Sequence, residues 1–214
     1  MSIELGHFTV ILAFAIAAGS LGVTQTIVPV EREPRHRLAF ENEYVKVLDV
    51  LFPPGYVSLF HRHSLDNVAI RISGGTIRTD QLAAEGSPQD VPPGRVTFFS
   101  GTPPYVHRVA NLGTTAVQIV DVELVGTKST PDDRAVDDLI RHVIVPENER
   151  VRVSRIQLSP GESLPSHTHQ RGWLEVVIAG PKPGQFTWHA GGTRMPAATA
   201  SLSRPLEIVE IEPK

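Results

Sequence analysis

The strongest constraint on the fold of this chain is an internal repeat. Residues 36–63 align with residues 142–169 without a gap, at a constant offset of 106 positions. Each half also ends in a similar alternating segment, QIVDVEL at 118–124 and EIVEIE at 207–212. The sequence therefore predicts two small domains of the same fold. The matched pairs include Glu41 and Glu147, Val45 and Val151, Val47 and Val153, Pro54 and Pro160, Gly55 and Gly161, His61 and His167, His63 and His169, and Gly74 and Gly180.

Within each half the hydrophobic pattern has the period of a β-strand. Residues 44–51 and 151–158 are rich in β-branched residues, alternate with polar ones, and lead into Pro-Gly turns. With 17 glycines and 18 prolines, the chain favours many turns over long helices. We therefore expect an all-β fold, with each half a small β-barrel or jelly roll that protects its strand edges. One helical pattern, with Thr130, Pro131 and Asp133 at its start, predicts a short helix between the halves.

The N-terminus differs from the rest of the chain. Residues 8–23 are almost wholly apolar and end in small residues, which is typical of a secretory signal peptide. An uncleaved membrane anchor and a buried element are the alternatives, since the residues before the apolar run include Glu4 and no Lys or Arg. The expected organisation is a signal peptide or anchor at 1–26, a lead-in without an element at 27–35, repeat one at 36–126, a helical linker at 127–141 and repeat two at 142–214.

The composition of the chain excludes several partners and several kinds of catalytic or metal site. A net charge of -3 offers no basic surface for nucleic acid, so we expect no nucleic-acid partner. The chain has no cysteine, which excludes disulfides, thiolate catalysis and thiolate metal sites. Any metal must be held by nitrogen and oxygen ligands, and the nine histidines become the residues to place.

Two histidines in each half have the spacing of metal ligands on a strand. His61 and His63 are two residues apart, so their imidazoles project from one face of a strand, about 7 Å apart along the chain. His167 and His169 repeat this pair. His107 follows a turn-rich stretch and begins another expected strand.

The segment around the first pair resembles the first motif of the cupin superfamily, with Gly55, His61, His63 and Gly74 at the family spacing. The segment from Gly101 through His107 to Asn111 resembles the second cupin motif. The resemblance covers residues 36–213 as a bicupin, a protein with two cupin barrels. It implies a divalent metal inside barrel one, held by His61, His63 and His107, with Fe, Mn, Ni and Zn all candidates.

Repeat one departs from the family where the usual glutamate is replaced by Asn67. Asn67 remains a further candidate ligand through its amide oxygen. If it does not bind, three neutral imidazoles leave the ion its full charge, and the site should attract an anionic substrate. Alternation places Arg71 on the same face, where it could anchor that anion or extend to solvent. Tyr105 is a catalytic candidate together with Arg71, and Asn111 is a candidate to orient an imidazole or bind substrate, or simply a turn residue.

Repeat two departs further. Trp173 stands at the glutamate position, and Pro196 or Ala197 stands where a third histidine is expected. A reassembled site could use His167, His169, Glu175 and His189. The alternative is a degenerate barrel that binds no metal and is filled by Trp173 and Trp188.

Two classes of function follow from the resemblance. The first is an exported, metal-dependent enzyme acting on a small oxygenated anion, with a dioxygenase as the leading reaction class and an isomerase or lyase next. The second is a non-catalytic protein that binds a small molecule or metal. We expect a small-molecule ligand, a periplasmic or extracellular location, membrane contact only through an uncleaved leader, and pairing of two copies as an option for the assembly.

Overall fold

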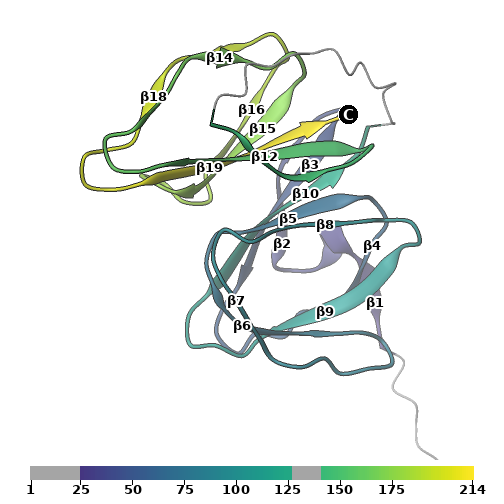
Figure 1. Ribbon diagram of the computed structural model, residues 1–214. Helices are drawn as coiled ribbons and strands as arrows, with labels where there is room; N and C mark the ends of the chain where they lie inside the picture. The colour runs from purple at the N-terminus through teal and green to yellow at the C-terminus, as the bar shows by residue number, and fades with distance from the viewer. Residues whose placement is uncertain (1–24, 127–140) are drawn as a thin grey trace, which may run out of the picture.

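The computed structural model describes residues 25–126 and 141–214. The expected signal peptide, apart from its last two residues, and the expected linker helix lie outside these ranges. Among the described residues, no helix has the length and apolarity needed to cross a membrane. The described chain is all-β apart from one 3-10 turn, and it forms two halves that lie one above the other (Figure 1).

The N-terminal half contains two five-stranded sheets, ordered β1-β4-β9-β6-β7 and β2-β3-β10-β5-β8. Neighbouring strands are antiparallel except for β1 and β4, which run parallel. This is the expected jelly roll of two facing sheets. Its elements are β1 (Ile27–Pro29), the 3-10 turn η1 (Val30–Arg32), β2 (His36–Glu41), β3 (Val45–Phe52), β4 (Phe60–His63), β5 (Asn67–Arg71), β6 (Gly75–Asp80), β7 (Gln89–Val91), β8 (Val96–Phe99), β9 (Tyr105–Asn111) and β10 (Val117–Leu124).

The C-terminal half repeats this plan in a reduced form. One five-stranded sheet has the order β11-β12-β19-β15-β16, and two short ladders, β13-β18 and β14-β17, face it. The two Pro-Gly turns are equivalent, since Gly55 and Gly161 both have a left-handed backbone, with φ of 73° and 80°. Its strands are β11 (Val143–Glu147), β12 (Val151–Leu158), β13 (Ser163–Leu164), β14 (His167–Thr168), β15 (Trp173–Ala179), β16 (Phe186–His189), β17 (Arg194–Met195), β18 (Ala198–Thr199) and β19 (Leu206–Pro213).

The largest hydrophobic cluster lies between the two halves. On β10, Val120, Val122 and Leu124 join residues of β12, β15 and β19 in this cluster. The alternate residues of β10, among them Ile119 and Asp121, line a cavity inside the N-terminal half. Because successive side chains of a strand point to opposite faces, β10 contributes at once to the core between the halves and to the interior of its own barrel.

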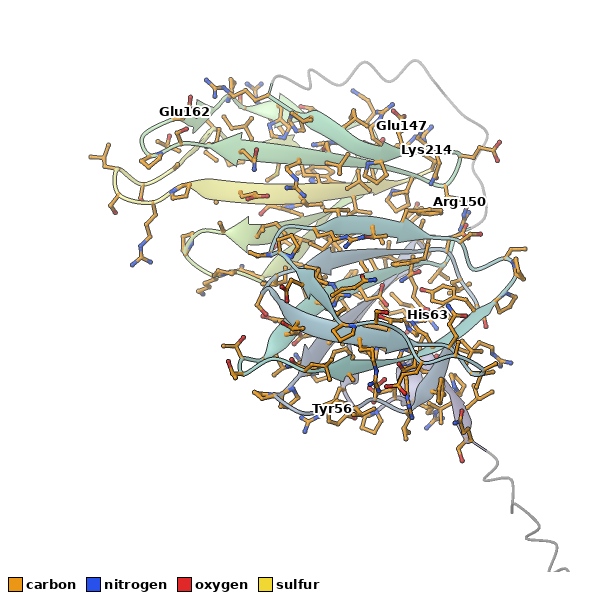
Figure 2. All side chains as sticks on the ribbon, turned by 60° about the horizontal axis from the view of Figure 1, so that its bottom comes forward. Tyr56, His63, Glu147, Arg150, Glu162 and Lys214 are labelled. Carbon is orange, nitrogen blue, oxygen red and sulfur yellow. The ribbon has the colours of Figure 1, made fainter. Side chains whose placement is uncertain are left out.

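A partly buried arginine also joins the halves. Arg150, at the start of β12, donates to the backbone oxygens of Leu124 and Gly126 and lies 2.8 Å from the Asp66 carboxylate. Figure 2 shows Arg150 at the boundary between the halves, with His63 inside the N-terminal half. The two barrels are thus held together by a shared apolar core with a polar contact at its edge.

The expectation that residues 27–35 form a lead-in without an element is wrong. Ile27–Pro29 is strand β1, which pairs with β4, and Val30 is buried in the core of the N-terminal half. Glu33 is also buried, and it accepts hydrogen bonds from His36, Tyr56 and the backbone N–H of Arg35. Because prolines flank this segment, its short strand carried too weak an alternation to be recognised.

Candidate metal centres

The first histidine cluster lies inside the N-terminal barrel. His61 and His63 are buried on β4, with ring centroids 5.2 Å apart. His107 on β9 is the register partner of His61, and its ring lies 4.5 Å from that of His61 and 5.2 Å from that of His63. The structure therefore brings together the three histidines that the sequence singled out.

The sequence analysis missed a fourth member, His36 at the start of β2. Its ring centroid lies 4.5 Å from that of His61, and His36, His61 and His63 form a group with ligand atoms within 4.8 Å of one another. The sequence did contain a signal for His36, because His36 and His142 are separated by the repeat offset of 106 positions. Each repeat thus carries a histidine, at the start of β2 in one and just before β11 in the other, that the local motif does not include.

Hydrogen bonds orient the imidazoles of this cluster. His36 Nδ1 lies 2.7 Å from Glu33 Oε2, and His61 Nδ1 lies 2.9 Å from the carbonyl oxygen of Leu59. Burial would raise the pKa of Glu33, but its hydrogen bonds to His36 and Tyr56 lower it to about 2. A carboxylate or carbonyl on one imidazole nitrogen is the usual partner of a metal-binding histidine, because it directs the other nitrogen at the ion.

The free nitrogens of this cluster fit a divalent metal. His61 Nε2 and His63 Nδ1 are buried and have no hydrogen-bond partner among the described residues. Burial, with the nearby His36 and His63, lowers the pKa of His61 to about 3, and burial likewise lowers the pKa of His107 well below its usual value. Buried imidazole nitrogens that converge on one site are the donor set that Fe, Mn, Ni and Zn accept.

The expectation of a site without carboxylates is wrong. His63 Nδ1 lies 3.8 Å from Asp121 Oδ2 and 3.6 Å from Glu123 Oε1, both buried on β10. These acids come from the last strand of the repeat rather than from the position of the family glutamate. Their negative charge partly offsets that of a bound cation.

Asn67 connects the tyrosine of the site to one of these acids. Its Nδ2 donates to Asp121 Oδ1 at 2.6 Å, and its Oδ1 accepts from the Tyr105 hydroxyl at 2.9 Å. The Tyr105 ring stacks on His63 with centroids 4.7 Å apart and planes 9° apart. With both ends of its amide engaged, Asn67 positions its neighbours in this structure.

Replacing Asn67 by Asp should destabilise the metal-free protein more than replacing Tyr105 by Phe. Asn67→Asp sets a carboxylate against Asp121 in place of an N–H donor, whereas Tyr105→Phe removes one neutral hydrogen bond. We expect a loss of about 0.5–1.5 kcal/mol in the free energy of unfolding for Tyr105→Phe and a larger loss for Asn67→Asp. Urea unfolding of both variants measures this, and equal losses would contradict the charged contact.

A cavity of about 270 Å³ opens beside the cluster. Asn67, Ala69 and Arg71 of β5 line it, as alternation along the strand predicts. Arg71 Nη1 is buried without a hydrogen-bond partner among the described residues, and burial lowers its pKa to about 10. Arg71 therefore remains charged at neutral pH and turns a free donor toward the interior.

Asn111 has a structural role here. Its Nδ2 donates to the carbonyl oxygens of Phe52 and Thr115, and its Oδ1 accepts from the N–H of Gly113. It is therefore the turn residue of the two alternatives, and the imidazole acceptor in this structure is the carbonyl oxygen of Leu59 on His61.

The second cluster lies inside the C-terminal barrel and differs from the expected one. The ligand atoms of His142, His167, His169 and Glu210 lie within 4.8 Å of one another. In strand register, Met195 faces His167 where His107 faces His61, so Met195, rather than Pro196 or Ala197, replaces the third histidine. The cluster instead recruits His142, the equivalent of His36, and Glu210 of β19.

Glu175 and His189 stand beside this cluster rather than in it. His189 Nε2 lies 3.8 Å from Glu175 Oε2, and the Trp173 ring stacks between His169 and His189, with centroid distances of 4.1 and 4.7 Å. Burial, together with the neighbouring Glu210, raises the pKa of Glu175. The structure thus keeps the His167–His169 pair of the expected set and pairs Glu175 with His189 separately.

No protein-family model matches this sequence, and no curated protein does. The fold is similar to solved structures of AerE from Microcystis aeruginosa (11% identity, TM-score 0.56, 85% of this chain and 98% of AerE) and of a salicylate 1,2-dioxygenase from Pseudaminobacter salicylatoxidans (11% identity, TM-score 0.55, 79% and 71%). A cupin domain protein from Bordetella pertussis is 26% identical, with a TM-score of 0.38 and coverage of 41% of this chain and 88% of that one.

The chain has the cupin fold in a bicupin arrangement. Each barrel carries a buried cluster that could hold a metal ion. The two clusters use different donors, so the two barrels are expected to differ in chemistry.

Proposed function

We propose that the N-terminal barrel is the active site of a metal-dependent enzyme that acts on a small oxygenated anion. The observation that carries the proposal is the shared cavity of about 270 Å³, lined both by the histidine cluster and by Arg71 with its free buried nitrogen. A buried guanidinium without a partner is costly, and an anionic ligand would pair with it.

The charges around the cavity support an anion. Arg71 and Arg95 line it together with Asp121, and Glu123 lies beside His63. With Glu33 beside His36 included, two arginines face three carboxylates, so a divalent ion would still leave the site with a net charge of about +1. A carboxylate or enolate that reached both the ion and Arg71 would neutralise it.

His36, His61 and His63 would hold the ion, with His107 at its side. When bound, the ion would supply Lewis-acid or oxygen-activating chemistry. Arg71 would fix the substrate's anionic group, and the Tyr105 ring would hold the plane of His63 through their stacking. The likeness in fold to a salicylate 1,2-dioxygenase supports a dioxygenase as the first reaction class to test, ahead of an isomerase or lyase.

Oxygen uptake tests this proposal. Protein loaded anaerobically with Fe²⁺ is mixed with air-saturated buffer and a panel of small aromatic and aliphatic hydroxy- and keto-acids. We expect substrate-dependent oxygen uptake, which is lost in His61→Ala. Conversion of an acid without oxygen uptake would favour an isomerase or lyase, and binding without conversion would contradict an enzyme.

Arg71→Ala should weaken anion binding by at least about tenfold, since a charged hydrogen bond contributes about 1.5–3 kcal/mol. Calorimetry with the best-binding acid on metal-loaded protein measures this. Arg62→Ala is the matched control, because Arg62 lies on the adjacent β4 with its side chain exposed. Equal affinity in Arg71→Ala and the control would remove Arg71 from the binding site.

A non-catalytic binding protein is the second candidate, and the state of Tyr105 favours it. Burial, with the nearby Asp121, raises the pKa of Tyr105 far above its usual value, and its hydroxyl donates to Asn67. The Tyr105 hydroxyl thus stays protonated. Because it is hydrogen-bonded to Asn67, it is poorly placed to exchange a proton with a substrate.

We also propose that the protein is exported. The support is the apolar segment at 8–23 and the small residues that follow it. Expression of the full chain in a bacterium, followed by mass spectrometry, should find a product that starts near residue 21–27 in the periplasm or medium. A full-length product in the membrane fraction would indicate an uncleaved anchor instead.

A further inference from the structure

The C-terminal cluster gathers three imidazoles around one buried carboxylate. His142, His167 and His169 all direct Nε2 at the buried carboxylate of Glu210. The three Nε2 atoms lie 2.9, 3.6 and 3.2 Å from the nearest Glu210 oxygen. These residues come from the start of β11, from the β14 segment and from β19, so three separate parts of the barrel converge on one point.

The spacing of these atoms suits a small ion. Bonds of about 2.0–2.2 Å to nitrogen and oxygen in a tetrahedron place neighbouring ligand atoms about 3.3–3.6 Å apart. The His167 distance of 3.6 Å lies in this range, the His169 distance of 3.2 Å is slightly shorter, and the His142 distance of 2.9 Å is the shortest. A direct hydrogen bond would account for the shortest distance, but the 3.6 Å contact of His167 is too long for one.

The contacts of the Nδ1 atoms indicate which nitrogen of each neutral ring carries the proton. His167 Nδ1 lies 3.2 Å from the carbonyl oxygen of Pro165, and His169 Nδ1 lies 3.4 Å from Glu212 Oε2. Both partners only accept hydrogen bonds, so in the neutral imidazoles Nδ1 carries the proton and Nε2 carries a lone pair. That lone pair then faces the Glu210 carboxylate, and two acceptors face each other across a buried gap. A cation between them, or a second proton on each ring, removes this conflict, and one cation would serve all three rings at once.

From this geometry we infer that His142, His167, His169 and Glu210 form a second, structural site for a divalent cation of the Zn²⁺ class. Four protein ligands complete a tetrahedron and leave no position open for substrate, which is the mark of a structural site. Trp173, fully buried against His169, fills the barrel at the position of the usual family glutamate. The ion would tie the start of β11 and the β14 segment to β19 and so close the shorter barrel.

This inference is independent of the function proposed for the N-terminal barrel, and the test keeps the two apart. The experiment uses the full chain with His61→Ala and His63→Ala, which disables the first cluster. This background is loaded with Zn²⁺ and desalted, and its metal content and melting temperature are measured. We expect about one zinc ion per chain and a higher melting temperature than that of the metal-free sample.

Glu210→Gln in this background should abolish both the bound zinc and the rise in melting temperature. Glu175→Gln is the matched control, because Glu175 is the register partner of Glu210 on β15 and is the same residue type. It should retain the zinc. Since loss of Glu210 could disturb folding, His142→Ala is a second route to the same loss, with circular dichroism to verify the fold.

Co²⁺ provides a readout that does not depend on stability. With Trp188→Phe added, Trp173 is the remaining tryptophan, and Co²⁺ bound to the adjacent His169 should quench its fluorescence; Glu210→Gln should prevent the quenching. The inference is overturned if the background binds no zinc, if Glu210→Gln retains it, or if Glu175→Gln loses it equally. In the first case the cluster is a protonated ion-pair network without a metal.

Discussion

His61→Ala is expected to lower the affinity of the N-terminal barrel for a divalent metal by more than about 100-fold. Loss of a residue that merely orients a ligand costs about 10- to 100-fold, and His61 offers a buried nitrogen directly to the ion. Zn²⁺ titration against a chelating dye measures the affinity, in a Glu210→Gln background so that one barrel is tested at a time.

The same titration identifies the third metal ligand of the N-terminal barrel. We expect His36→Ala to weaken binding as much as His61→Ala, because the ligand atoms of His36, His61 and His63 lie within 4.8 Å of one another. His107→Ala should weaken it less, and Arg62→Ala, an exposed neighbour on β4, should leave it unchanged. Near wild-type affinity in His36→Ala, with a large loss in His107→Ala, would restore the ligand set that the family resemblance implies.

Ile70→Ala is expected to lower the free energy of unfolding by about 2–5 kcal/mol. Ile70 is fully buried in the cluster between the two halves, so its truncation leaves a cavity in the core that both barrels share. Leu202→Ala is the control, because Leu202 is 91% exposed, and its change should remain within about 0.5 kcal/mol.

The shared core also predicts how the protein unfolds. Because residues of both halves bury one another, urea unfolding followed by circular dichroism and by tryptophan fluorescence should give coincident transitions. Both tryptophans are in the C-terminal half, so a fluorescence transition separate from the overall loss of β-structure would show that the barrels unfold independently.

If both clusters bind metal, the two barrels have different roles: the N-terminal site binds a ligand and the C-terminal site stabilises the fold. The N-terminal cluster opens to a cavity with a free arginine nitrogen, which suits exchange of a ligand. The C-terminal cluster is closed by Glu210 and by the stacked Trp173. The position of the family glutamate thus holds a linking amide, Asn67, in one barrel and a space-filling ring, Trp173, in the other.

The strands and the histidine pair were predictable because their signals are local. Alternation along 44–51 and 151–158 predicted strands that the structure has as β3 and β12, and the spacing of His61 and His63 predicted two buried imidazoles on one strand. The short strand at Ile27–Pro29 was missed, since its pairing with β4 rather than its own pattern makes it a strand.

The remaining members of the clusters were not predictable in the same way. His36, Asp121 and Glu210 belong to strands far along the chain from the histidine pairs, and no short motif includes them. Strand register makes Asp121 and Glu210 equivalent, because their partners Leu48 and Ser154 are separated by the repeat offset. The offset also relates His36 to His142, so the repeat held part of this information.

By itself, the sequence determined the duplication, the all-β architecture, the resemblance to cupins and the two histidine pairs, because repeats, two-residue alternation and HxH spacing are properties of neighbouring residues. Only the tertiary structure decided which other side chains meet those pairs. In the N-terminal barrel, β2 and β10 lie in the sheet that faces the histidine strand β4, so His36, Asp121 and Glu123 reach one cluster, while His142, just before β11, and Glu210 of β19 complete the other. Position within the closed barrel, rather than distance along the chain, selects these ligands.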